Sequence, residues 1–92
     1  MSLDIRWQSP ELQLAGTLDR NTVPGLWQRR ASFVGLKTLA VNGLDKVDTA
    51  GLAVLLDLCE RYPEVRVTGA SERLKKLAEL GDLEDILPIE HS

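Results

Sequence analysis

The sequence predicts one α/β domain, a mixed β-sheet with helices packed mainly on one face. Two stretches near the start alternate apolar with polar residues, which is typical of half-buried strands. Further along, segments with a helical spacing of apolar residues alternate with short strand-like segments. In order these elements give ββαβαβα. The 92 residues are expected to form a single domain over 1–92, with no room for a second.

The first two strands are expected to form an antiparallel hairpin. Residues 3–8 and 11–16 both alternate apolar with polar side chains. Ser9-Pro10 lies between them and is a turn signal. Because so few residues separate the two segments, they are expected to pair with each other.

A helix is expected after this hairpin. Residues 19–21 offer capping side chains, and Pro24 fits a first helical turn. One helical face would then carry Val23, Leu26, Trp27 and Val34, with Phe33 beside it and Arg30 inside the apolar stripe.

The rest of the chain predicts two more strands and two more helices. Residues 36–42 become apolar toward their end, as a central strand does, and 43–47 are expected to form a loop. Asp48 opens a helix that runs to about residue 61, where Tyr62-Pro63 stops it. The last elements are a strand over 64–69, a helix over 72–80 between Ser71 and Gly81, and a final turn or short helix over 83–88.

Composition and charge argue against several classes of function. Cys59 is the only cysteine and His91, near the end, the only histidine, so we expect neither a zinc site nor a Cys-His catalytic set. There is no Gly-rich phosphate loop with a lysine, so we expect no enzyme and no cofactor. The net charge of −3 argues against nucleic acid as a partner. No apolar run reaches the roughly 20 residues of a membrane span, so we expect no membrane insertion.

The helix after Asp48 carries more apolar surface than one sheet is expected to cover. The expected core stripe is Leu52, Leu55, Leu56 and Cys59, and a second apolar sector beside it is Gly51, Val54 and Leu58. Together the two sectors span an arc of roughly 200° at 100° per residue, and a sheet normally covers little more than half of that. Two interpretations stay open: neighbouring helices cover the second sector, or it is left for a partner protein.

The start of this helix also has two interpretations. Asp48 or Thr49 is expected to cap the helix by accepting hydrogen bonds from its first free amides. Alternatively, the Thr49 hydroxyl is exposed at the surface, where a partner protein recognises it or a kinase phosphorylates it. A phosphate there would be favoured by the free amides and repelled by Asp45 and Asp48.

The stretch Val47-Asp48-Thr49-Ala50-Gly51-Leu52 resembles the signature of STAS domains, the sulphate-transporter and anti-sigma-factor-antagonist family. In that family a strand leads through a loop to Asp-Ser/Thr-x-Gly-Leu at a helix start. The element order and the length fit as well, so the resemblance covers essentially the whole chain. Within the family, the chain is most similar to the small STAS subunits of Mla phospholipid ABC transporters of Gram-negative bacteria. Trp7 and the segments 14–19, 26–30 and 77–88 carry that similarity.

The resemblance implies a non-catalytic, cytoplasmic accessory subunit that is peripheral to the inner membrane. Such a subunit binds the transporter's ATPase subunit, in a complex that also has a permease. It supports assembly and activity of a system that maintains the lipid asymmetry of the outer membrane. Thr49 matches a residue at the ATPase interface. The expected partner-binding residues are Asp48, Thr49, Ala50, Gly51, Val54, Leu58, Trp27 and Arg30.

The alternative function within the same family is an anti-sigma factor antagonist that is regulated by phosphorylation at Thr49. Two departures from the family pattern weaken this alternative more than the transporter interpretation. Asn42 stands where STAS strands commonly end in Asp, and Thr49 stands where a phosphorylated antagonist usually has Ser.

Overall fold

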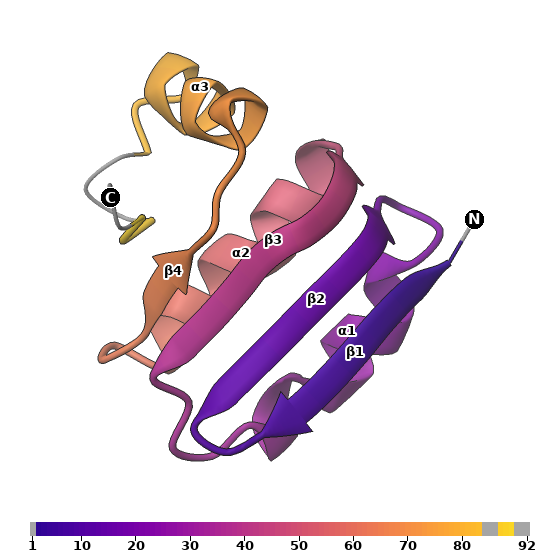
Figure 1. Ribbon diagram of the computed structural model, residues 1–92, viewed down its shortest axis with the longest axis vertical. Helices are drawn as coiled ribbons and strands as arrows, with labels where there is room; N and C mark the ends of the chain where they lie inside the picture. The colour runs from indigo at the N-terminus through magenta and orange to yellow at the C-terminus, as the bar shows by residue number, and fades with distance from the viewer. Residues whose placement is uncertain (1, 84–86, 90–92) are drawn as a thin grey trace.

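The computed structural model describes residues 2–83 and 87–89. Its centre is a four-stranded sheet in the order β1-β2-β3-β4 (Figure 1). The elements are β1 (Leu3–Gln8), β2 (Glu11–Leu18), α1 (Val23–Arg29), the 3-10 turn η1 (Arg30–Ser32), β3 (Thr38–Val47), α2 (Thr49–Arg61), β4 (Arg66–Thr68) and α3 (Glu72–Leu80). This succession confirms the predicted α/β class and the order ββαβαβα.

The sheet is mixed, as predicted, because its first two strands pair differently from the others. β1 and β2 form the expected antiparallel hairpin, in which Ile5 lies opposite Leu14. β2 pairs with β3 in parallel, and β3 pairs with β4 in parallel. The hairpin turn lies at Ser9-Pro10, where the sequence placed it.

The predicted loop over 43–47 is wrong, because these residues form the second half of β3. They pair in parallel with the end of β2, where Ala15 lies opposite Gly43 and Leu18 opposite Val47. A Cβ on Gly43 would lie 2.8 Å from the Ala15 Cβ, so glycine lets the two strands approach here. The hydrogen-bond partners of these residues belong to β2, which is distant in the sequence. The local sequence therefore does not indicate a strand here.

The last part of the chain differs from the prediction mainly at β4. This strand covers three residues instead of the predicted 64–69, and Val67 on it also bridges to Ile89. The predicted final turn over 83–88 includes residues 84–86, which lie outside the described residues. Leu87 just beyond them is buried in the core.

The helix before η1 is shorter than predicted. It ends at Arg29, so Val34 lies outside it and is 76% exposed rather than on a shared apolar face. Leu26 is its one buried residue, and Phe33 reaches the core from beyond η1. The predicted cap at 19–21 is also wrong, since the N-cap is Thr22 and makes no side-chain cap bond. Instead the Asp19 carboxylate accepts the amide of Asn21 at 2.9 Å within the preceding turn.

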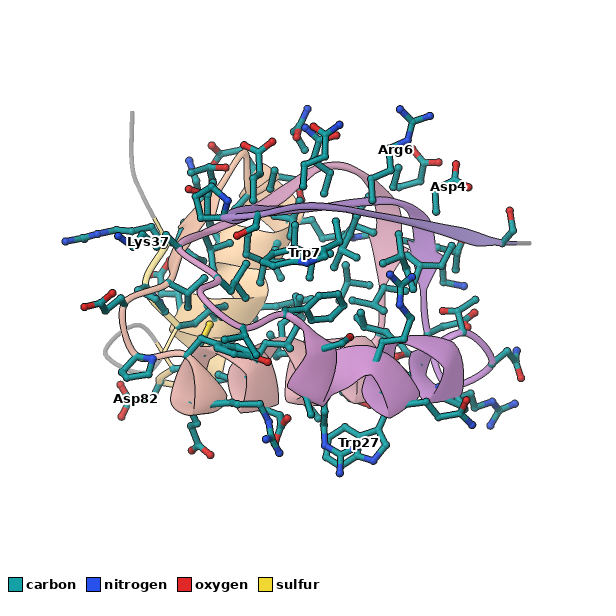
Figure 2. The ribbon with its side chains drawn as sticks, turned by 90° about the horizontal axis from the view of Figure 1, so that it is seen from below. Asp4, Arg6, Trp7, Trp27, Lys37 and Asp82 are labelled. Atoms are coloured by element: carbon teal, nitrogen blue, oxygen red, sulfur yellow. The ribbon has the colours of Figure 1, made fainter. Side chains whose placement is uncertain are left out.

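α1 and α2 lie side by side on one face of the sheet, as predicted (Figures 1 and 2). Leucines of β2 and β3 form the sheet side of the core between the two layers. Trp7 points into this space and packs against Phe33, with ring centroids 5.3 Å apart. Asp4 and Arg6 point away from the helices, on the open face of the sheet (Figure 2).

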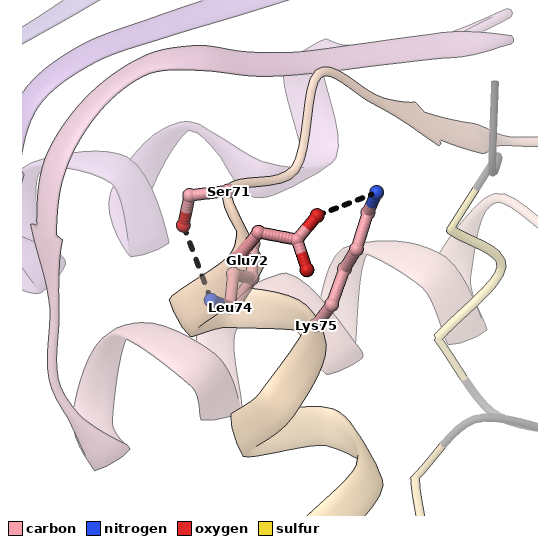
Figure 3. Close-up of polar contacts among 4 residues, drawn as sticks. All are labelled: Ser71, Glu72, Leu74 and Lys75. Carbon is pink, nitrogen blue, oxygen red and sulfur yellow. Dashed lines mark hydrogen bonds and ion pairs between the residues drawn. The ribbon is translucent and has the colours of Figure 1, made fainter.

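α3 confirms the predicted bounds and the predicted cap. The Ser71 hydroxyl accepts a hydrogen bond from the Leu74 amide at 3.1 Å (Figure 3). Glu72 and Lys75 form an ion pair at 3.6 Å on its exposed side. The helix ends at Gly81, as expected from the sequence.

Candidate functional site

Asp48 organises the start of α2 and ties it to the loop before α1. One carboxylate oxygen, Oδ1, accepts the Gly51 amide at 2.9 Å, which caps the helix. The other, Oδ2, accepts the Arg20 amide at 3.1 Å. The Asp48 amide donates to the Leu18 carbonyl oxygen at 3.2 Å. Of the two capping candidates in the sequence, the structure therefore selects Asp48.

These hydrogen bonds lower the pKa of Asp48 below its ordinary value of 3.8. The bond from the Gly51 amide has the largest effect, and desolvation opposes it by raising the pKa. The amides of Arg20 and Ala50 and the charge of Lys46 lower it further. The ionised carboxylate is thus the form that the folded helix start favours.

We expect the contribution of Asp48 to stability to depend on pH. Because the pKa of Asp48 in the folded state lies below 3.8, its contribution to stability is fully present above pH 3.8. The contribution is lost as the pH falls from there through the lower pKa of the folded state. Asp48→Asn keeps a side-chain acceptor but does not titrate. Thermal unfolding should show the unmodified protein to be the more stable of the two at neutral pH, with the difference shrinking below about pH 4. A difference that stays constant down to pH 2 would argue against an ionised cap.

Gly51 has a structural role that explains the glycine of the signature. The residue is buried where the first turn of α2 crosses the end of β2. A Cβ at this position would collide with the Leu18 carbonyl oxygen and lie 2.9 Å from the Leu18 Cγ. Only glycine lets α2 approach β2 this closely, so Gly51 is not available to a partner.

The structure corrects the predicted orientation of α2. Its buried residues are Gly51, Val54, Leu55, Leu58 and Cys59. Leu58 is 0% and Val54 1% exposed, so the second apolar sector, which the sequence left open between cover within the domain and a partner protein, faces the domain's own core. The spacing i, i+3, i+4, i+7, i+8 of the buried set is that of one helical face. Leu52 and Leu56, predicted to be central to the core, are only half-buried at its margin.

A shallow groove runs between α1 and α2 on the side away from the sheet. Its lining residues are Val23, Trp27, Ala50, Ala53, Val54, Leu56, Asp57 and Glu60. The floor is made of small and aliphatic side chains, while the only charged residues in the lining are the two acids. Thr49 is exposed directly before Ala50 at one end. The groove therefore offers a narrow apolar strip bordered by negative charge.

Trp27 forms the most prominent wall of this groove. Its side chain is 41% exposed and projects from α1 away from the sheet (Figure 2). The Arg30 guanidinium lies over the indole, with Cζ 4.0 Å from the ring centroid. The same guanidinium donates from Nη1 to the Trp27 carbonyl oxygen at 2.7 Å. Arg30 thus holds a large apolar ring in place at the surface.

Side-chain hydrogen bonds connect the two helices near both ends of the groove. At one end, Asp48 before α2 binds the Arg20 amide before α1. At the other, the Tyr62 hydroxyl at the end of α2 donates to the Arg30 carbonyl oxygen after α1. These two hydrogen bonds fix the distance between α1 and α2 before any partner binds, which lowers the entropic cost of docking.

The structure brings part of the predicted partner-binding set together. Trp27, Ala50 and Val54 line the groove, with Val54 only in its floor, and Thr49 and Arg30 adjoin it. Gly51 and Leu58 are excluded by burial, which contradicts their predicted role. The groove also contains lining residues that were not predicted from the sequence, namely Val23, Ala53, Leu56, Asp57 and Glu60. Four of these residues lie on α2, on the side around Ala53 that is opposite its buried face. A helical wheel drawn with the correct buried face would have predicted all four.

Comparison with known proteins identifies the family of the chain. A family model described as "Mlab, STAS domain" matches residues 1–88. The intermembrane phospholipid transport system binding protein MlaB of Escherichia coli K12 is 32% identical over 96 residues, covering 96% of this chain and 99% of the relative. MlaB of Shigella flexneri matches with the same identity and coverage.

Solved structures show the same fold at lower sequence similarity. The unphosphorylated anti-sigma factor antagonist SpoIIAA has a TM-score of 0.66 at 13% identity, covering 98% of this chain and 88% of its own. The phosphorylated Bacillus cell fate determinant SpoIIAA has a TM-score of 0.64 at 14% identity, covering 98% and 92%. No helix in the described part of the chain is long and apolar enough to cross a membrane. The full-length match to the family model and the identity to the two MlaB proteins place the chain in the MlaB-type STAS domain family.

Proposed function

We propose that this chain is a non-catalytic accessory subunit of a phospholipid ABC transporter and that its α1–α2 groove binds the ATPase subunit. The proposal places it in the cytoplasm, peripheral to the inner membrane, in a complex that includes a permease. The transporter would maintain the lipid asymmetry of the outer membrane. Its two MlaB relatives carry the name of an intermembrane phospholipid transport system, which supports this setting.

The exposed Trp27 is the observation that carries the binding proposal. A tryptophan that a stacked arginine holds at the surface, beside an apolar strip, is typical of the centre of a protein–protein interface. Thr49 lies at the end of the same strip, so one partner surface could contact both. The hydrogen bonds at the two ends of the groove hold α1 and α2 in place, so the groove is already formed before a partner binds.

The alternative, an antagonist switched by phosphorylation at Thr49, has less support from the geometry. The Gly51 amide in the first turn of α2 already binds the Asp48 carboxylate. A phosphate on Thr49 would compete with that carboxylate and be repelled by it. The likeness to SpoIIAA, at 13% identity, concerns the fold alone.

Thr49→Arg is expected to disrupt binding without unfolding the chain. Thr49 is exposed, so a long side chain there projects into the proposed interface rather than into the core. Isothermal titration with the purified ATPase subunit should show a loss of affinity of about tenfold or more. Gln8→Arg is the control and should bind normally, because Gln8 is exposed in β1 and strand alternation places it on the same face of the sheet as Asp4 and Arg6, which point away from the helices (Figure 2). Equal affinity of the two variants would remove the α2 start from the interface, and no binding by the unmodified chain would refute the proposed function.

A further inference from the structure

Asp57 in the middle of α2 carries a buried oxygen with no hydrogen-bond partner. Its Oδ2 atom is shielded from solvent, and none of the described residues donates a hydrogen bond to it. The side chain as a whole is half-buried and belongs to the lining of the groove, together with Trp27 and Glu60. Asp57 therefore belongs to the wall of a surface groove, and its shielded Oδ2 atom becomes available to a donor from outside when the carboxylate turns toward the groove.

Such an oxygen is costly for an isolated domain. A buried acceptor without a donor has lost its hydrogen bonds to water, and no hydrogen bond within the protein replaces them. Native proteins keep few of these groups, and those they keep call for a specific explanation. The hydrogen bonds that join the two helices near the groove ends use other acceptors, so they do not explain Asp57.

No cation of the described residues pairs with Asp57. Arg30, at the α1 side of the groove, is bound to the ring and carbonyl oxygen of Trp27 instead. The groove lining contains Asp57 and Glu60 but no Lys or Arg. Within the described part of the chain, the ion pair found is Glu72–Lys75 on α3. None of the ion pairs found in the described part of the chain thus neutralises Asp57 or Glu60.

We propose that the bound partner supplies the missing donor, and that Asp57 anchors a Lys or Arg side chain of a segment lying in the groove. The same segment would present an apolar side chain to Trp27, across the groove from Asp57. A basic and an apolar side chain on one helical or extended segment match the charge and the floor of this groove. This inference rests on the proposed function and names the chemistry of its partner.

The proposal predicts opposite effects of one substitution on stability and on binding. Asp57→Asn removes the charge of the unpaired carboxylate, so the isolated chain should be at least as thermostable as before. In the complex, the same change removes the acceptor charge and leaves the partner's cation buried without a counter-charge. A residue with a purely structural role would lose stability instead and leave binding intact.

The test measures both quantities on the full chain and its purified ATPase subunit. Isothermal titration should show Asp57→Asn binding about tenfold or more weakly, whereas Glu60→Gln, the same neutralisation at an exposed position of the groove, should change affinity less than about threefold. Thermal unfolding of Asp57→Asn should be unchanged or shifted upward. Asp57→Ala provides a second neutral variant, should the asparagine fold poorly.

The outcomes separate this inference from the proposed function. If the unmodified chain binds the ATPase subunit and both neutral variants bind equally well, the inference fails and the proposed function stands. If the unmodified chain does not bind, both fall together. A weaker complex for both neutral variants, with normal binding by Glu60→Gln, supports the ion pair.

Discussion

Leu58→Ala is expected to lower the free energy of unfolding by about 3 kcal/mol. The side chain is 0% exposed, so its removal leaves a cavity between α2 and the sheet. A domain of this size has a total stability of only about 5–14 kcal/mol, so this loss is large. Leu58→Asp would bury an unpaired charge at the same place, and we expect that variant not to fold.

Urea unfolding followed by circular dichroism measures this effect. Leu80→Ala is the matched control, because Leu80 is also in a helix but 78% exposed, and it should change stability by less than about 0.5 kcal/mol. The contrary result would be a Leu58→Ala protein of normal stability that fails to bind its partner. It would place Leu58 on the surface of α2, as one of the two interpretations of the apolar arc had it.

Trp27→Ala is expected to reduce affinity for the ATPase subunit about a hundredfold, because central interface tryptophans are worth roughly 2–4 kcal/mol on truncation. The loss arises from the apolar area of the ring and from the release of Arg30, which now stacks on it. Stability should change little, since the ring is 41% exposed and projects away from the core.

Isothermal titration and thermal unfolding of the same preparation separate the two effects. Val34→Ala serves as the control, because Val34 is also apolar and exposed, at 76%, but does not line the groove. Normal affinity of Trp27→Ala would remove the groove from the proposed interface. A large loss of stability would show instead that the ring is part of the core.

The elements that the sequence predicted well are those with local signals. The hairpin follows from period-two alternation around Ser9-Pro10, and α3 follows from the Ser71 cap and Gly81. Asp48 is one of the two cap candidates that the sequence offers, because a capping side chain acts on an amide only about three residues away, and the structure selects it over Thr49. In each case the interaction that defines the element lies within a few residues of chain.

The features that the sequence missed depend on contacts between distant segments. Residues 43–47 become a strand because β2 is there to pair with them. The orientation of α2 was not decided by its own sequence, since two adjacent sectors are apolar and only packing against β2 and β3 shows which one is buried. The unpaired Oδ2 of Asp57 has no signature in the sequence at all.

The central claim, that the α1–α2 groove receives the ATPase subunit, is tested most directly by hydroxyl-radical footprinting of the two tryptophans. Trp27 is exposed in the groove, whereas Trp7 of β1 is half-buried against Phe33 and serves as the internal reference. We predict that saturation with the ATPase subunit strongly reduces oxidation of Trp27 and leaves that of Trp7 unchanged. Undiminished oxidation of Trp27 in the complex, with protection of the open sheet face around Arg6 instead, would contradict the account.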